Sequence, residues 1–163
     1  MSQEFNETVG VTLRETATDD EPFLFRVYAS TREEEMAAWG WSPAQQDMFL
    51  RMQFRAWQQG LLADASATED RIIIRDGQPI GRIVVIHAVG EITLADIALL
   101  PEHRGTGIGS TLIQELQGEA ARDRLPLRLH VAHDNRAARL YHRLGFVAIG
   151  DTGVHIKMEW LPQ

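Results

Sequence analysis

A run of closely spaced glycines is the clearest candidate for a ligand-binding loop in the sequence. Residues 104–110 read Arg-Gly-Thr-Gly-Ile-Gly-Ser, between an apolar segment that predicts a strand and a periodic segment that predicts a helix. Glycines at such a place let the backbone turn sharply and direct successive N–H groups at one point near the positive end of the helix. The loop is therefore suited to a phosphate group, although a tight strand-to-helix turn uses the same residues.

Two common phosphate-binding motifs do not match this loop. The dinucleotide motif Gly-x-Gly-x-x-Gly, started at Gly105, requires a glycine where the sequence has Ser110. The NTPase phosphate loop requires Gly-Lys-Ser/Thr, and the single lysine of the chain is Lys157. We therefore do not expect ATP or GTP chemistry.

Composition excludes several other classes of protein. The 163 residues are 44% apolar and 24% charged, which predicts one domain over 1–163. The absence of cysteine excludes disulfide scaffolds, thiolate zinc sites and cysteine nucleophiles. No apolar stretch approaches the roughly 18 residues that cross a bilayer, and the first ten residues show no signal pattern, so we expect a cytoplasmic protein without a membrane partner.

The charge of the chain is acidic and unevenly distributed. A net charge of -7 argues against binding to nucleic acid. Residues 1–70 hold 13 Asp/Glu and 5 Arg, whereas residues 71–163 hold 10 Asp/Glu and 11 Lys/Arg. The acidic part could attract a cationic amine and the other part a polyanion, although a solvated surface also explains the difference.

The six histidines include no His-x-x-x-His pair, so no metal site is expected.

Hydrophobic periodicity predicts strands that alternate with helices. We expect strands over 11–14, 71–75, 80–85, 91–100, 126–131, 146–149 and 154–160, and helices over about 20–30, 43–57, 108–122 and 135–144. Asp76-Gly77 predicts a hairpin turn. In the second helix we expect most of one apolar stripe to lie in the core, namely Met48, Phe49, Met52, Ala56 and Trp57. The pattern indicates an α/β (mixed α+β) fold around a central sheet.

Two segments carry a resemblance to a known family. Residues 97–109, Ile-Ala-Leu-Leu-Pro-Glu-His-Arg-Gly-Thr-Gly-Ile-Gly, resemble the acyl-coenzyme A signature of the GNAT superfamily of N-acetyltransferases, with its Arg, first Gly and second Gly at Arg104, Gly107 and Gly109. Residues 135–146 are similar to the family's later element, an Asn followed by Ala-x-x-x-Tyr-x-x-x-Gly-Phe. Many members place this asparagine seven residues before the tyrosine, where Asp134 stands here. The resemblance covers about residues 71–160.

The resemblance implies a GNAT-like, mostly antiparallel twisted sheet of about six to seven strands with helices on both faces. It implies that backbone groups of one strand bind the pantetheine arm and the thioester carbonyl, here those of Ile97, Ala98 and Leu99, with an N–H near Leu99 stabilising the oxyanion. It also implies a pyrophosphate site at Arg104, Gly105, Thr106, Gly107, Ile108, Gly109 and Ser110. Asn135 would contact the pantetheine arm or cap its helix.

The family places a phenol near the coenzyme sulfur, and Tyr141 matches it, which implies the role of general acid. A tyrosine that only packs a helix on the sheet is the alternative. The resemblance does not identify the general base directly. Some family members have a catalytic glutamate at the position where this sequence has Thr93. Glu91, Asp96 and His130 are the candidates, and we prefer Glu91 and His130, each with a structural alternative.

The function implied is transfer of an acetyl group from acetyl-CoA to a primary amine of a small molecule, by direct attack in a ternary complex and without a metal. An acetyltransferase of protein N-termini or lysines and a non-catalytic acyl-CoA-binding sensor are the alternatives. The acceptor pocket would lie at 28–57, where Glu33-Glu34-Glu35, Trp39 and Trp41 could bind a cation or an apolar group. Family habit suggests a homodimer.

Overall fold

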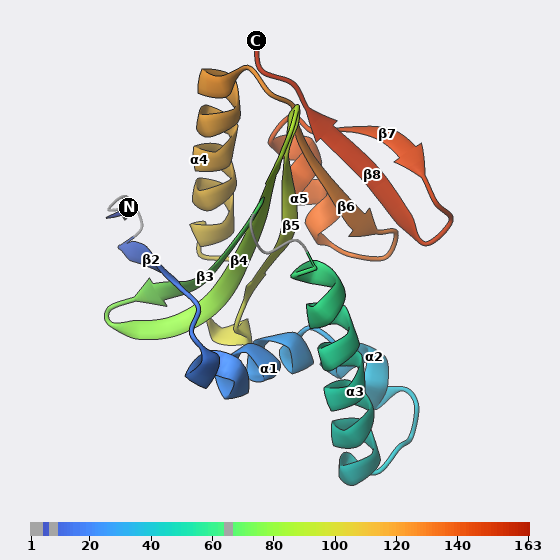
Figure 1. Ribbon diagram of the computed structural model, residues 1–163. Coiled ribbons are helices and arrows are strands. Elements are labelled where there is room, and N and C mark those ends of the chain that lie inside the picture. Colours follow the sequence, from blue (N-terminus) through green and yellow to red (C-terminus); the bar gives the residue numbers. More distant parts are fainter. Residues whose placement is uncertain (1–4, 7–9, 64–66) are drawn as a thin grey trace.

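The protein is built on one twisted sheet with helices on both faces (Figure 1). The computed structural model describes residues 5–6, 10–63 and 67–163. The strand order is β1-β2-β3-β4-β5-β6-β8-β7. The strands are β1 (Phe5–Asn6), β2 (Val11–Glu15), β3 (Thr68–Arg75), β4 (Gln78–Ala88), β5 (Glu91–Leu99), β6 (Leu127–Ala132), β7 (Val147–Asp151) and β8 (His155–Trp160).

The predicted, mostly antiparallel sheet is confirmed, since among the paired strands described only β5 and β6 run parallel. The two-residue strand β1 brings the sheet to eight strands, one more than the upper number expected. The hairpin turn at Asp76-Gly77 is also confirmed. Both residues have positive φ, 51° and 78°, as a two-residue turn between strands requires.

In the described residues, five α-helices cover the two faces of this sheet. They are α1 (Glu21–Ser30), α2 (Glu33–Ala37), α3 (Pro43–Leu61), α4 (Ile108–Asp123) and α5 (Ala137–Arg143). The core on one face joins α4 and α5 to Ile73 of β3, and the core on the other face joins α1, α2 and α3 to the neighbouring Ile72. Successive side chains of a strand point to opposite faces, so β3 separates the two cores. No helix in the described part of the chain is long and apolar enough to span a membrane.

The apolar stripe expected in the second helix is wrong for most of its members. Met48 and Met52 of α3 are 73% and 63% exposed, and the buried residues are Leu50 and Phe54. Both pairs are spaced by four residues, so both satisfy helical periodicity. Leu50 and Phe54 face the sheet, where they pack with Tyr28 of α1 and with Ile72. Which of the two pairs is buried therefore depends on how α3 docks on the sheet.

Candidate active site

Strands β5 and β6 separate part of the way along their length. They pair only over Ile92↔Leu127, Thr93↔Arg128 and Leu94↔Leu129. Beyond Leu94, β5 continues to Leu99 beside β4, while β6 continues to Ala132 beside β8. The two strands diverge visibly in Figure 1. The structure therefore has an opening in the sheet, and the residues at its edges are those that follow position 94 in β5 and position 129 in β6.

A β-bulge in β5 decides which side chains face this opening. Val84 is opposite Asp96 and Val85 is opposite Leu94, so Ala95 is an extra residue in β5. Leu94 before the bulge and Ile97 after it both pack with the core under α4. Because the bulge shifts the alternation by one residue, the Asp96 side chain faces the α1–α3 side of the sheet.

The backbone of β5 offers hydrogen-bonding groups to the opening. The Leu100 N–H donates to the Ile80 carbonyl at 2.8 Å. Opposite residues in an antiparallel pair alternate between bonded and non-bonded, so the groups of Ala98 face β4 and those of Ile97 and Leu99 face away from β4. The Leu99 carbonyl accepts from Arg104 Nε at 3.0 Å. The Leu99 N–H therefore points away from β4, towards the opening.

The glycine loop is open and ends in a helix N-terminus. Gly105 and Gly107 have φ of 73° and 85°, a region that favours glycine. Gly107 directly precedes α4, and no side chain caps that helix. A Cβ built on Gly105, Gly107 or Gly109 would meet no described atom within 4 Å. The first turn of α4 thus has room beside it for a bulky anionic group.

Arg104 ties this loop to the end of α1. Its guanidinium lies 3.2 Å from Ser30 Oγ and 3.4 Å from the Ser30 carbonyl oxygen, in addition to the bond with Leu99. Positive charge is thereby held beside the glycine loop, where a pyrophosphate would bring negative charge.

Asp96 and Tyr141 are near enough to each other for the charge of Asp96 to affect Tyr141. Tyr141 of α5 is 8% exposed and packs edge-on to Phe146 with ring centroids 5.7 Å apart. Burial, with the nearby charge of Asp96, raises the pKa of Tyr141 to about 12. Burial also raises the pKa of Asp96 to about 6, against the opposing charges of Arg82 and Arg32. The Tyr141 phenol is therefore neutral at physiological pH. The Asp96 carboxyl titrates at a pH somewhat below the physiological value.

A buried arginine supports the same face of the sheet. Arg82 of β4 is 1% exposed, and its guanidinium donates to both Asp70 carboxylate oxygens at 2.8 and 2.7 Å. It also donates to Gln58 Oε1 of α3 at 2.9 Å and lies 5.3 Å from the centre of the Trp57 ring. No motif in the sequence points to Arg82 or Asp70. Arg82 is a single charged residue in the apolar run 80–85, whereas Asp70 stands between Glu69 and Arg71 in a charged run of β3.

The structure separates the other predicted catalytic residues. Glu91 begins β5, at the end remote from Leu99, and accepts from Arg128 Nη1 at 2.8 Å. His130 is exposed on β6, directly after the last residue that pairs with β5. Asn135 lies just before α5, and its Oδ1 accepts from the N–H of Ala137, the first residue of that helix, at 2.8 Å. Of the two predicted catalytic residues, His130 lies at the edge of the opening, and Glu91 lies at the opposite end of β5.

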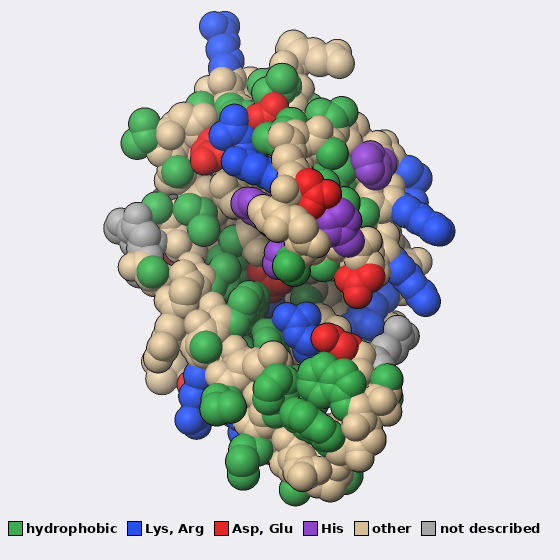
Figure 2. Space-filling model, turned by 90° about the vertical axis from the view of Figure 1, so that its right-hand side faces the viewer, with side chains coloured by type: hydrophobic (Ala, Val, Ile, Leu, Met, Phe, Trp, Pro, Cys, Tyr) green, Lys and Arg blue, Asp and Glu red, His purple; other side chains and the backbone are tan. Residues whose placement is uncertain are grey.

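The expected acceptor region carries an aromatic cluster. Trp39, Trp41 and Phe49 pack edge-on to one another, with ring centroids 5.1 to 5.6 Å apart, and the two indoles are each 39% exposed. Glu33 and Glu35 are exposed. Figure 2 shows this side of the molecule hollowed at mid-height, with acidic and histidine side chains gathered around the hollow and a hydrophobic patch below it. A separate cavity of about 360 Å³ lies between α1 and α3, lined by Phe25, Arg51 and Phe54 among others.

Comparisons with known proteins agree with this geometry. The acetyltransferase (GNAT) domain family matches residues 68–148. The PaiA N-acetyltransferase of Thermoplasma acidophilum, solved in complex with coenzyme A, is 19% identical with a TM-score of 0.70, over 93% of this chain and 98% of that one. The ribosomal-protein-S18-alanine N-acetyltransferase of Escherichia coli is 20% identical with a TM-score of 0.64, over 94% and 95% of the two chains.

A spermidine N-acetyltransferase SpeG chimera from Vibrio cholerae and hSSAT is 22% identical with a TM-score of 0.61, over 93% and 95% of the two chains. A search of curated proteins found no significantly similar sequence. The family match over residues 68–148 identifies the chain as a GNAT acetyltransferase.

Proposed function

We propose that this protein transfers the acetyl group of acetyl-CoA to a primary amine of a small molecule by direct attack in a ternary complex. The observation that carries the proposal is the opening between β5 and β6, because it exposes unpaired strand backbone next to an uncapped helix N-terminus. An extended thioester arm can pair with such a backbone while its pyrophosphate meets the helix.

Coenzyme A would bind along the glycine loop and along the end of β5 that includes Ile97 and Leu99. Gly105 to Ser110 would hold the pyrophosphate through N–H groups, with Arg104 adding positive charge. Ile97 would pair with the pantetheine arm. The Leu99 N–H would donate to the oxyanion that develops as the thioester is attacked, a contribution of about 3 kcal/mol for one preorganised donor. Asn135, whose side chain accepts from the Ala137 N–H, would keep the loop before α5 in position.

We propose Asp96 as the general base for the acceptor. An ammonium group must lose a proton before it can attack, and Asp96 faces the α1–α3 side at the edge of the opening. The pKa of Asp96, raised to about 6 by burial, brings this carboxylate closer to the operating pH than an ordinary aspartate. Glu91 is already engaged by Arg128 at 2.8 Å. His130 is the second candidate, as a relay from the β6 side.

Tyr141 would donate a hydrogen bond to the leaving sulfur. Its pKa of about 12 keeps the phenol protonated, so a donor is always present. A thiol has a pKa of about 8.5, so complete transfer of the phenol proton to the thiolate would run uphill by more than three units. Tyr141 would therefore stabilise the thiolate by a hydrogen bond, without transferring its proton completely.

To test this proposal, coenzyme binding and the release of free coenzyme thiol are measured for the wild type and for the variant Gly109→Glu. Gly109 has ordinary helical φ and open space at its Cβ position, so this variant adds bulk and negative charge without backbone strain. We expect calorimetry to show acetyl-CoA binding to the wild type and at least about tenfold weaker binding to the variant. Gly118→Glu, farther along α4, is the matched control.

Equal binding by both variants would contradict the loop assignment. If wild type binds acetyl-CoA, a panel of small amines and peptides then assays the acceptor by release of free coenzyme thiol. Turnover only with peptides would replace the small-molecule acceptor by a protein one, and tight binding without turnover on any amine would indicate a sensor. The cytoplasmic location and the homodimer expected from the sequence stay predictions.

A further inference from the structure

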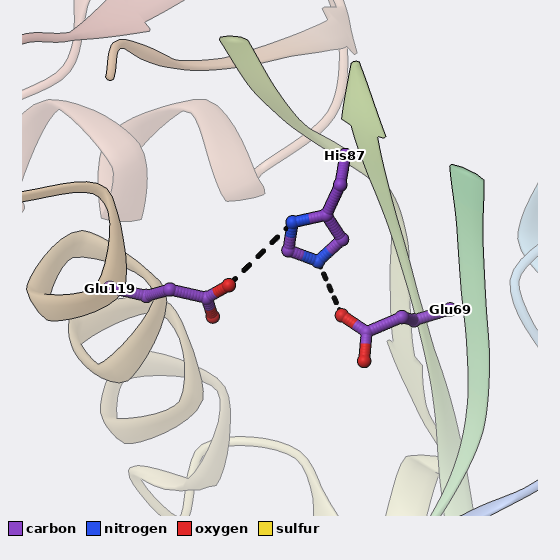
Figure 3. A group of neighbouring side chains, drawn as sticks. All are labelled: Glu69, His87 and Glu119. Atoms are coloured by element: carbon purple, nitrogen blue, oxygen red, sulfur yellow. Dashed lines mark hydrogen bonds and ion pairs between the residues drawn. The ribbon is translucent and has the colours of Figure 1, made fainter. Parts of the chain in front are cut away.

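We propose that Glu69, His87 and Glu119 bind a divalent transition-metal ion, with Zn²⁺ as the cation whose ligand preferences they fit. The three residues come from β3, β4 and α4, on the sheet face opposite to Asp96. Figure 3 shows the imidazole of His87 between the two carboxylates, each of which points at a different ring nitrogen. The site is separate from the acetyltransferase site and does not depend on the proposed function.

One of the distances between ligand atoms is close to that in a metal site. One ligand atom from each residue lies within 4.8 Å of the other two. His87 Nδ1 and a Glu119 carboxylate oxygen are 3.6 Å apart. Two ligand atoms bound to one tetrahedral Zn²⁺ at about 2.1 Å are separated by about 3.4 Å, so this pair needs little movement. Glu69 contacts Nε2, the other nitrogen of the same ring, so it would reach an ion held at Nδ1 by moving to another side-chain rotamer.

The donor set and its surroundings suit a dication. One imidazole and two carboxylates are ordinary ligands of Zn²⁺, with a water in the fourth position. Arg71 contacts the second carboxylate oxygen of Glu69, and it could serve as the outer partner of that carboxylate if the contact is kept when Glu69 moves to the ion. Glu115 lies one helical turn before Glu119 on α4 and lines the same small cavity, and it adds negative charge.

A water ligand and a route of entry are both available. Glu69 and Glu119 line a cavity of about 50 Å³ between the sheet and α4, large enough for a water molecule. The side chains of the three residues are 33% to 39% exposed, so an ion reaches them without unfolding of the domain. A bound ion would cross-link two strands to the helix that carries the glycine loop at its start.

The competing interpretation is a histidine that only forms ion pairs with the two carboxylates. The test is calorimetry and thermal unfolding of metal-free protein titrated with zinc chloride in a non-chelating buffer. We expect one saturable site per chain in the wild type and a rise in Tm that a chelator reverses, because the ion binds the folded state. Co²⁺ in place of Zn²⁺ should give the visible spectrum of a tetrahedral site.

Glu119→Gln and His87→Gln should each weaken Zn²⁺ binding by roughly tenfold or more, since each removes a ligand. Both changes nearly preserve side-chain shape, and circular dichroism checks that the variants fold. His133→Gln is the matched control, because His133 contacts one carboxylate, Asp151, at 2.8 Å elsewhere on the surface. Absence of saturable binding by the wild type, or equal loss of binding in the His133 variant, would overturn the proposal.

Discussion

Asp96 and Tyr141 approach the opening between β5 and β6 from different elements, a bulged strand and a helix on the opposite face of the sheet. The negative charge of Asp96 adds to burial in raising the pKa of Tyr141 to about 12. Burial in turn raises the pKa of Asp96 to about 6. One neighbourhood thus holds a phenol that stays protonated and a carboxylate with a pKa of about 6, the two groups that the proposed mechanism uses.

Asp96→Asn should remove the base. We expect kcat/KM to fall by about 100-fold or more, because proton transfer by a positioned base contributes about that much. The acidic limb of the wild-type pH profile, rising through about pH 6 as Asp96 loses its proton, should disappear. Glu91→Gln is the control, since Glu91 is paired with Arg128, and its rate should stay within a few-fold of wild type. Loss of the same limb in His130→Gln would assign the base to His130 instead.

The same variant should be more stable than the wild type. The folded pKa of Asp96, about 6, exceeds the ordinary value of 3.8, so the folded state binds this proton more tightly than the unfolded state. Ionised Asp96 therefore costs stability, increasingly as pH rises from about 4 to 6. In urea unfolding at pH 7.5, Asp96→Asn should gain about 1 to 3 kcal/mol. The gain should shrink towards pH 4; a less stable variant at pH 7.5 would contradict burial as the cause.

Tyr141→Phe should slow turnover by about tenfold, less than the loss of a full acid catalyst. The phenol donates one hydrogen bond to the leaving sulfur, and the remaining ring still packs on Phe146. Steady-state rates with acetyl-CoA measure this, with the KM for the coenzyme expected to change little. A rate equal to wild type would leave Tyr141 with packing alone.

Gly81→Ala should destabilise the fold by about 2 kcal/mol, because the strands of the site approach too closely for a side chain. A Cβ at Gly81 would lie 2.3 Å from the Ala98 carbonyl oxygen of β5. Gly118→Ala is the matched control: its Cβ would meet only the Arg122 side chain at 3.7 Å, and alanine favours a helix by about 0.5 to 1 kcal/mol. Urea unfolding of both variants compares them, and similar midpoints would contradict the steric argument.

The glycine loop, the β3–β4 turn and the alternation of strands and helices could be predicted from the sequence. Each of these depends on local physics: positive φ at Gly105 and Gly107, a two-residue turn at Asp76-Gly77, and apolar periods of two or about 3.6 residues. The same local spacing led to the acetyltransferase resemblance, and the family match over 68–148 confirms it.

Only the tertiary structure decided which side chains meet. The bulge at Ala95 turns Asp96 towards the α1–α3 face, and it exists only in the pairing of β5 with β4. Docking of α3 selected Leu50 and Phe54 over two methionines of equal spacing. Glu69, His87 and Glu119 come together from three separate elements. Periodicity is a property of one segment, whereas register, docking and clustering are properties of segments against one another, and no single segment encodes them.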